Sequence, residues 1–321
     1  MLEQVKPVGM NEIHAAQARL AGLAMITPVV ACQAAPPGKT VRLKLENLQP
    51  IGSFKIRPIG NAVRTRTPAQ LAAGIYTSSS GNSALGVAWM ARELGIAGTA
   101  VVPANAPAAK LDKLRRLGAR IEMLSVEDWW RAIRVGRLSE QQGVYIDAVR
   151  DPACLAGDAT VGLEILQQFP DVEAILVPFG GGGLACGIAC AVRLLRPDVK
   201  IIACELETAH PCQAALAAGA PVETPHESGF VSGVGFSTVL PEMWPLIKSR
   251  VDSVITVSLA EVAAAIKVLV ENNRVVAEGA GAIPVAAALS GRYEQSNVCA
   301  VVSGGNLDSA MLTTILQGGV P

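Results

Sequence analysis

Short apolar runs alternate along this chain with longer segments in which apolar residues recur every three or four positions. Short apolar runs bounded by turn residues are typical of buried parallel strands, and the longer spacing is typical of helices that cover such strands. Because the two patterns alternate along most of the chain, they predict open, twisted, doubly wound α/β sheets with right-handed crossovers.

In the first half of the chain, the apolar runs predict strands at residues 41–46, 74–77, 99–102, 120–123 and 144–147. The helical spacing predicts helices at residues 11–23, 53–64, 82–94, 108–117 and 127–141. We expect Ser53 to cap the second of these helices, because a serine side chain can accept a hydrogen bond from the first helical turn.

The second half repeats the alternation, with strands expected at residues 174–177, 201–205, 253–257 and 298–302. Helices are expected at residues 155–168, 184–195, 259–271 and 280–289, with one more at the end of the chain. Residues 219–245 are rich in Gly, Pro and Ser and show little period, so we expect a long functional loop there.

Composition and charge narrow the class of protein. Half of the 321 residues are apolar and 17% are charged, which suits a two-domain enzyme with a large core. The formal net charge is zero, so no nucleic-acid partner and no anionic membrane partner are expected. The uncharged stretch 174–192 is interrupted by Pro178 and four glycines, so it predicts strand, loop and buried helix.

Cysteine and histidine usage argues against disulfides and against a histidine metal site. The chain has an odd number of cysteines, seven, and none of them form a CxxC pair. The three histidines are widely separated in the sequence. The N-terminus carries Glu3, Lys6 and Glu12 and does not resemble a signal peptide. A reduced, cytoplasmic setting is therefore expected.

Two segments suggest a specific chemistry when they are taken together. Lys55 lies in Ser53-Phe54-Lys55-Ile56, just after a predicted strand, and Gly180–Gly183 follow another strand. Alone, the lysine predicts a solvated surface residue and the glycines a tight turn. As a pair, they supply an amine that can form an imine with pyridoxal phosphate and backbone amides that can hold its phosphate.

Two more loops join a strand to a helix. Thr77 to Asn82 offers hydroxyls and amides that could hold a substrate carboxylate, and Ser303 to Asn306 offers a hydroxyl for a heterocycle nitrogen. The alternative for both loops is a helix cap. All four segments fall at the carboxyl ends of predicted strands, where ligands bind in open α/β sheets.

Together these segments resemble the fold-type II pyridoxal-phosphate enzymes, which are tryptophan synthase β-like, and within them the serine/threonine dehydratase and serine racemase group. The resemblance covers almost the full length. It is carried by residues 44–49, 52–55, 80–82, 103–110, 156–164, 180–183, 278–282 and 303–306.

The resemblance implies a role for each matching residue. Lys55 would bind the cofactor and remove the Cα proton, and a neutral Ser303 beside the ring nitrogen would favour β-elimination over transamination. The cofactor would be held by Phe54, Lys55, Asn82, Gly180, Gly181, Gly182, Gly183, Glu278 and Ser303. The substrate would be held by Ser78, Ser79, Ser80, Gly81, Asn82 and Ala148.

The implied activity is that of an ammonia-lyase, which converts a β-hydroxy amino acid such as threonine or serine into a 2-keto acid and ammonia. Residues 45–145 would form a small substrate-binding domain. Residues 1–44 and 146–321 would form a large cofactor-binding domain. A homodimer is expected because relatives in this group often form one.

The chain departs from the family pattern at three places. Ser83 stands where the family usually has a histidine, and Asp147-Ala148-Val149 replaces a His-Pro segment, which suggests room for a bulkier substrate such as threo-3-phenylserine. At the cation site of many relatives, Glu205 and Ala209 match, but Pro211 replaces the expected acidic ligand. A hard cation needs several oxygen ligands, so no metal is expected.

Two other functions stay open at this point. Ser80 resembles the serine that acts on the opposite cofactor face in serine racemases, so it is a candidate second catalytic residue for an amino-acid racemase. Binding of the substrate carboxylate by Ser80 is favoured, because a hydroxyl needs a lowered pKa to act as a base. A non-catalytic sensor that binds pyridoxal phosphate is the alternative outside the enzymes.

Overall fold

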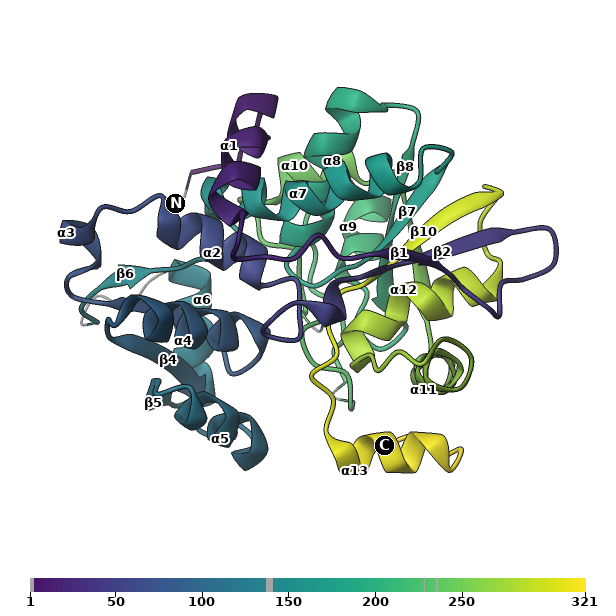
Figure 1. Ribbon diagram of the computed structural model, residues 1–321. Coiled ribbons are helices and arrows are strands. Elements are labelled where there is room, and N and C mark those ends of the chain that lie inside the picture. Colours follow the sequence, from purple (N-terminus) through teal and green to yellow (C-terminus); the bar gives the residue numbers. More distant parts are fainter. Residues whose placement is uncertain (1–2, 137–140, 228, 235) are drawn as a thin grey trace.

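Two sheets built mainly of parallel strands lie side by side in the computed structural model, which describes residues 3–136, 141–227, 229–234 and 236–321. Within these residues, one sheet has six strands and the other has four. Figure 1 shows the four-stranded sheet and its helices at the lower left, and the six-stranded sheet at the right. The predicted α/β fold with two open parallel sheets is therefore confirmed.

The six-stranded sheet has the order β1-β2-β10-β7-β8-β9. Its strands are β1 (Val29–Ala31), β2 (Thr40–Leu45), β7 (Ala174–Pro178), β8 (Lys200–Leu206), β9 (Ser253–Val257) and β10 (Asn297–Val302). All neighbours pair in parallel except β1, which pairs with β2 in antiparallel fashion. The sequence did not reveal β1, because three residues are too few to show a period.

Helices cover both faces of this sheet, as Figure 1 shows. The first face packs against α1 (Met10–Leu20), α7 (Pro152–Gln168), α8 (Gly183–Leu195), α9 (Pro211–Ala218) and α10 (Trp244–Arg250). The second face packs against α11 (Leu259–Val268) and α12 (Gly279–Ser290), with α13 (Ser309–Leu316) beyond them. Because both faces are covered, the central strands β7, β8 and β10 are buried almost throughout, whereas the edge strand β9 alternates between buried and partly exposed residues.

The four-stranded sheet has the order β5-β4-β3-β6, and all its pairs are parallel. Its strands are β3 (Ile75–Ser78), β4 (Gly98–Pro103), β5 (Arg120–Leu124) and β6 (Val144–Tyr145). The helices of this part of the chain are α2 (Ile56–Arg64), α3 (Pro68–Leu71), α4 (Asn82–Leu94), α5 (Ala108–Arg116) and α6 (Val126–Val135). Helix α2 packs against α4 and also against α7, so it joins the two sheets.

Several predicted helices differ at their ends; α1 ends at Leu20 rather than residue 23, and α7 begins at Pro152 rather than residue 155. Three further differences concern α2, α6 and α11. Helix α2 begins at Ile56, and the predicted cap is wrong: the Ser53 hydroxyl has no hydrogen-bond partner among the described residues, and its backbone bridges to Gly304. Helix α6 ends at Val135, before the expected end at residue 141, because Gly136 takes a left-handed conformation; residues 137–140 lie outside the described part. Helix α11 continues as a π-helical turn, η2 (Leu269–Asn273).

All seven cysteines are buried and free, as their number and spacing predict. Among the described residues, no helix is both long enough and apolar enough to cross a bilayer.

Candidate active site

A cleft of about 430 Å³ contains every residue that the sequence predicts for the cofactor and the substrate. This volume is typical of small-molecule sites. Strand ends and helix starts of both sheets form its walls. The predicted residues that line it are Phe54, Lys55, Ser78, Ser79, Ser80, Gly81, Asn82, Ala148, Gly180, Gly181, Gly182, Gly183, Glu278 and Ser303.

Lys55 is positioned by two loops that are joined along their backbones. The N–H of Phe54 donates to the carbonyl of Ser303 at 2.9 Å, and the N–H of Gly305 donates to the carbonyl of Gly52 at 2.8 Å. Lys55 is the residue before the first turn of α2, and its Nζ lies 4.6 Å from the centre of the Phe54 ring. The lysine loop and the loop after β10 are therefore one unit.

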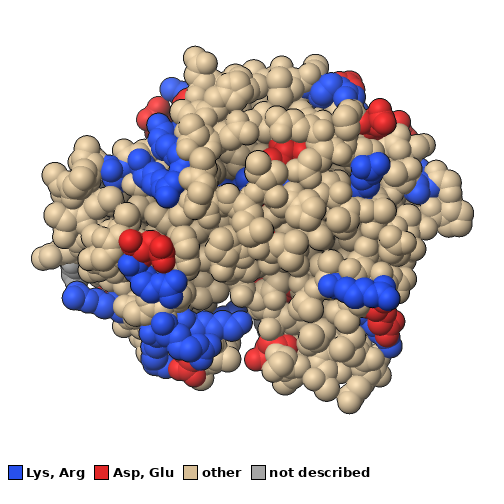
Figure 2. Space-filling view, in the orientation of Figure 1, with Lys and Arg blue, Asp and Glu red and all other residues tan. Residues whose placement is uncertain are grey.

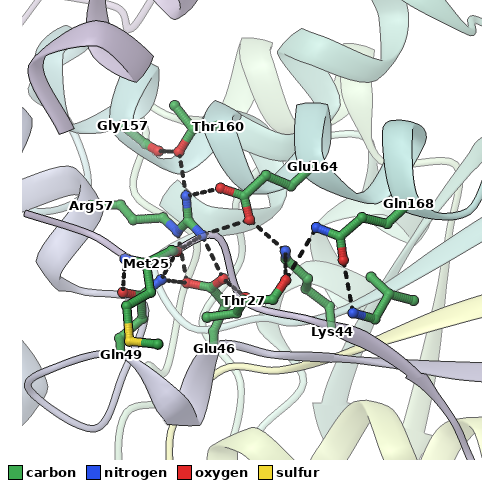
Figure 3. A network of polar contacts seen from close by, with 11 residues as sticks. Met25, Thr27, Lys44, Glu46, Gln49, Arg57, Gly157, Thr160, Glu164 and Gln168 are labelled. Atoms are coloured by element: carbon green, nitrogen blue, oxygen red, sulfur yellow. Dashed lines mark hydrogen bonds and ion pairs between the residues drawn. The ribbon is translucent and has the colours of Figure 1, made fainter. Parts of the chain in front are cut away.

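A buried ionic network fixes the helix that follows Lys55 (Figure 3). Arg57 donates to both oxygens of Glu46, from Nε at 2.8 Å and from Nη2 at 2.9 Å, and to both oxygens of Glu164, at 2.6 and 2.8 Å. Lys44 adds a 2.5 Å contact to Glu164. Two cations and two anions balance here. Because Arg57 is tied to β2 through η1 (Glu46–Leu48) and to α7, the start of α2 is held against the large sheet.

The loop of four glycines leaves no room for a larger residue at Gly180, and its Gly182 takes a left-handed conformation with a φ of 88°. A Cβ on Gly180 would lie 2.4 Å from the carbonyl oxygen of Gly233, so the two backbones touch. The loop leads into α8, whose N-terminal N–H groups receive no side-chain cap. Free N–H groups at a helix start bind anions, so this loop fits the phosphate of pyridoxal phosphate.

Four helices begin at the cleft, and none has a capping side chain. The residues before their first turns are Lys55 for α2, Gly81 for α4, Gly182 for α8 and Glu278 for α12. Of the other described helices, α3, α6, α7, α11 and α13 are capped by a threonine, serine or aspartate side chain, whereas α1, α5, α9 and α10 also lack one. Uncapped helix starts leave partial positive charge in the cleft, which favours a ligand with several anionic groups.

The alternative that the loops from Thr77 to Asn82 and from Ser303 to Asn306 serve as helix caps is wrong for both. The cap position of α4 is Gly81, which makes no side-chain bond, and α13 is capped by Asp308, which lies beyond the second loop. Within the first loop, the N–H of Gly81 donates to the Ser79 hydroxyl at 3.1 Å. The Ser78 hydroxyl is buried next to the Tyr145 side chain, which also lines the cleft.

Asn82 links the two sheets across the cleft. Its Nδ2 donates to Glu278 at 2.5 Å, and its Oδ1 accepts from Asn306 at 2.8 Å. Burial raises the pKa of Glu278 to about 7, although Asn82 and the charge of Lys110 act in the opposite direction. The asparagine predicted to contact the cofactor therefore also holds α4 beside α12.

Sequence reasoning missed an aromatic wall. Trp129, Trp130, Tyr145 and Phe236 line the cleft together with Phe54, so five of the twelve aromatic residues of the chain gather there. The rings of Trp130 and Phe236 are 5.8 Å apart and nearly perpendicular, and Trp129 and Trp130 are 4.9 Å apart. The tandem tryptophans in a chain with few aromatics were a signal for one part of this wall, but nothing in the sequence placed Phe236 beside them.

Two lysines of α5 were also missed as cleft residues. Lys110 and Lys113 line the cleft, and burial lowers the pKa of Lys110. The C-terminal half of α5 is basic, with Lys113, Arg115 and Arg116. Figure 2 shows this cluster of Lys and Arg on the lower-left lobe, beside a hollow that separates it from the lower-right lobe. The wall opposite the large sheet is therefore positively charged.

Glu205 and Ala209 lie outside this cleft. The two carboxylate oxygens of Glu205 accept the N–H groups of Cys212 and Gln213 at 2.8 and 2.9 Å, at the start of α9. Burial raises the pKa of Glu205 to about 7. Among the described residues, no group of three or more His, Cys, Asp or Glu side chains could hold a metal ion.

Comparisons with known proteins agree with this geometry. Residues 21–304 match the family described as pyridoxal-phosphate dependent enzyme. The chain is 37% identical over 288 residues to an L-threonine ammonia-lyase of Thermotoga maritima, which covers 88% of this chain and 71% of that relative. It is 33% identical over 328 residues to a catabolic L-threonine dehydratase of Staphylococcus aureus, which covers 99% of this chain and 95% of that relative.

Among solved structures, maize serine racemase superposes with a TM-score of 0.88 at 32% sequence identity. The superposition covers 97% of this chain and 98% of the racemase. The overall fold of this chain is thus similar to that of a serine racemase.

Proposed function

This chain belongs to the pyridoxal-phosphate-dependent enzyme family, and from that premise we propose that it is an ammonia-lyase acting on a β-hydroxy amino acid with a bulky, aromatic side chain. The family, the cofactor and the serine/threonine dehydratase class predicted from the motifs are confirmed. The sensor alternative is dropped, because the relatives at 33–37% identity are enzymes. The products would be a 2-keto acid and ammonia.

The chemistry divides between the cofactor and the residues of the cleft. Bound pyridoxal phosphate withdraws electrons from the Cα of an amino acid and so makes its proton acidic. In our proposal Lys55 binds the cofactor and then accepts the Cα proton at Nζ. The glycine loop holds the phosphate, with Phe54, Asn82, Glu278 and Ser303 around the rest of the cofactor.

In this proposal, the loop from Ser78 to Asn82 orients the substrate. Its hydroxyls and the uncapped start of α4 would bind the substrate carboxylate, because a helix N-terminus favours an anion. With the carboxylate fixed there, the Cα–H bond can face Lys55 and the β-hydroxyl is free to leave. The neutral hydroxyl of Ser303 in the cleft supports elimination rather than transamination.

The aromatic wall is the observation that carries the substrate assignment. Trp130 and Phe236 form an edge-to-face pair that offers a third ring an apolar surface. Ala148, also a cleft residue, has a small side chain, and the resemblance to the family implies a larger one at this place. We infer that the wall receives the side chain of an aromatic β-hydroxy amino acid such as threo-3-phenylserine.

Racemase activity is the second candidate, and the likeness to maize serine racemase favours it. Ser80 lines the same cleft as Lys55, so it is the residue we assign to a second proton transfer if racemisation occurs. Elimination and racemisation begin with the same Cα proton removal. They differ in whether the β-hydroxyl leaves before a proton returns.

The remaining assignments are part of the same proposal. We propose residues 45–145 as the substrate-binding domain, and residues 1–44 with 146–321 as the cofactor-binding domain. A homodimer and a cytoplasmic location stay predictions.

The test is a substrate panel of threonine, serine and threo-3-phenylserine with the cofactor-loaded enzyme in deuterated buffer. We expect keto acid and ammonia from all three, the highest kcat/KM for phenylserine, and no activity from Lys55→Ala. Trp130→Ala should lower kcat/KM for phenylserine about two- to tenfold more than for threonine, since an aromatic pair contributes about 0.5–1.5 kcal/mol.

Threonine serves as the internal control for this variant, because it does not reach a wall built for a ring. A strong preference of the wild-type enzyme for serine would rule out the aromatic substrate. If the recovered amino acid were the opposite enantiomer labelled with deuterium and no keto acid were formed, the proposed activity would be that of a racemase rather than a lyase.

A further inference from the structure

Asp158 is a buried carboxyl that the proposed reaction does not use. It lies on α7, and its side chain faces the first turns of α8, where Gly187 allows the two helices to touch: a Cβ there would lie 2.5 Å from the Cβ of Asp158. The side chain is fully buried, and neither carboxyl oxygen has a hydrogen-bond partner among the described residues. Such a group is rare in folded proteins and calls for a ligand, a proton or both.

The carboxyl is next to the glycine loop. A Cβ on Gly183 would lie 3.5 Å from Oδ2 of Asp158, and Gly183 both lines the cleft and begins α8. Two independent features therefore coincide: a helix start without a capping side chain, and an unpartnered carboxyl directed at it. An anion bound at this helix start would lie close to a second, buried anion unless Asp158 carried a proton.

The surroundings of Asp158 allow its carboxyl group to be protonated near neutral pH. Burial raises the pKa of Asp158 to about 7, while the positive charges of Lys55 and Arg57 act in the opposite direction. Burial also raises the pKa values of the two neighbouring thiols, which therefore stay neutral. The titratable groups that face Asp158 are Lys55 and Arg57 of α2, Glu46 of η1, Cys154 of α7 and Cys186 of α8.

We propose that Asp158 takes up a proton from solvent when the phosphate group of the cofactor occupies the glycine loop. This inference rests on the proposed placement of the phosphate at Gly180–Gly183. A dianion brought next to a buried carboxyl favours its neutral form, and the neutral acid gains an O–H donor in place of a repelling charge. Cofactor binding and protonation of Asp158 are then linked, so each strengthens the other.

The experiment measures binding rather than turnover. Cofactor-free protein is titrated with pyridoxine 5′-phosphate, an alcohol that has no aldehyde for Lys55, between about pH 7.5 and 9.5, where the phosphate is a dianion because its second pKa is about 6. The protein binds pyridoxine 5′-phosphate in the form in which Asp158 is protonated, and rising pH removes that proton from the free protein. The wild-type dissociation constant should therefore rise by up to about tenfold per pH unit.

Asp158→Asn should show a dissociation constant that is nearly independent of pH in this range. Calorimetry of the wild type in two buffers of different ionisation enthalpy should count close to one proton taken up, and the variant close to none. Asp158→Ser is the second variant, chosen because a small neutral side chain fits the close contact between α7 and α8. Thermal unfolding of each variant checks that the fold is intact.

Glu205→Gln is the matched control, since Glu205 is another buried acid with its pKa raised to about 7. Its oxygens already accept backbone N–H groups at α9, so this variant should keep the wild-type pH slope. Repeating the titration with Lys55→Ala and with the double variant Lys55→Ala, Asp158→Asn removes any contribution of the lysine. The slope should persist in the first and vanish in the second.

Equal pH slopes in the wild type and in Asp158→Asn would overturn the inference, and so would a wild type that takes up no proton or does not bind pyridoxine 5′-phosphate. The proposed function fails differently. A protein that shows the expected proton linkage but forms no keto acid from any β-hydroxy amino acid would retain this inference and lose the lyase.

Discussion

At the scale of single residues, the helix that follows Lys55 depends on Arg57, a buried side chain whose partners lie far from it in the sequence. Lys55 and Asn82 could be recognised from motifs because their neighbours in sequence are characteristic. The partners of Arg57 could not be, because Glu46 and Glu164 lie 11 and 107 positions away and meet it only in the fold. Asp158 went unnoticed for the same reason: its lack of partners is a property of packing between helices.

Arg57→Lys tests the buried network that positions α2. A lysine keeps the charge but loses the fork that reaches both carboxylates, so Glu46 and Glu164 would lose hydrogen bonds in a buried site. We expect the free energy of unfolding to fall by about 2 to 4 kcal/mol, measured by urea denaturation.

Arg64→Lys is the control on the same helix. Its side chain is exposed and donates to backbone carbonyls at the surface, so this change should stay within about 0.5 kcal/mol. Equal losses in the two variants would show that the network adds nothing to the stability of the fold.

At the scale of elements, period and turn residues placed nearly all strands and most helices within a few positions. The failures have local causes. Strand β1 is too short to show a period, and α6 stops early because Gly136 ends it. The start of α2 was misplaced because Ser53 looks like a cap in sequence, whereas in the fold its backbone pairs with Gly304.

Gly180→Ala tests the element on which cofactor binding depends. The added methyl group would approach the carbonyl oxygen of Gly233, so the loop must shift away from its place before α8. Overpacking of this kind costs about 1 to 3 kcal/mol, and the dissociation constant for pyridoxal phosphate should rise by about tenfold or more, measured by absorbance titration.

Gly9→Ala provides the comparison, since a Cβ at this exposed glycine meets Glu12 at an ordinary 3.6 Å and Gly9 does not line the cleft. Its affinity for the cofactor should equal that of the wild type. An unchanged affinity in Gly180→Ala would mean that the phosphate binds somewhere else.

At the scale of the whole molecule, the alternation of strands and helices predicted the two sheets, and the order of motifs predicted which loops would meet. The cleft between the sheets brings together residues from position 54 to position 306. The aromatic wall could not be assembled from sequence, because Trp130 and Phe236 come from segments more than a hundred residues apart and belong to no shared motif. The residues proposed to select the substrate therefore become visible only in the folded structure, whereas the cofactor could be predicted from sequence motifs.

The most direct test of the account is to identify the lysine that binds the cofactor. The enzyme loaded with pyridoxal phosphate is reduced with borohydride and digested, and the labelled peptide is sequenced by mass spectrometry. Lys110 and Lys113 line the same cleft, and burial lowers the pKa of Lys110. These two lysines are therefore the alternatives to Lys55 as the residue that reacts with the cofactor aldehyde. We predict that the label lies on Lys55; a label on Lys110, Lys113 or any other lysine would contradict the account.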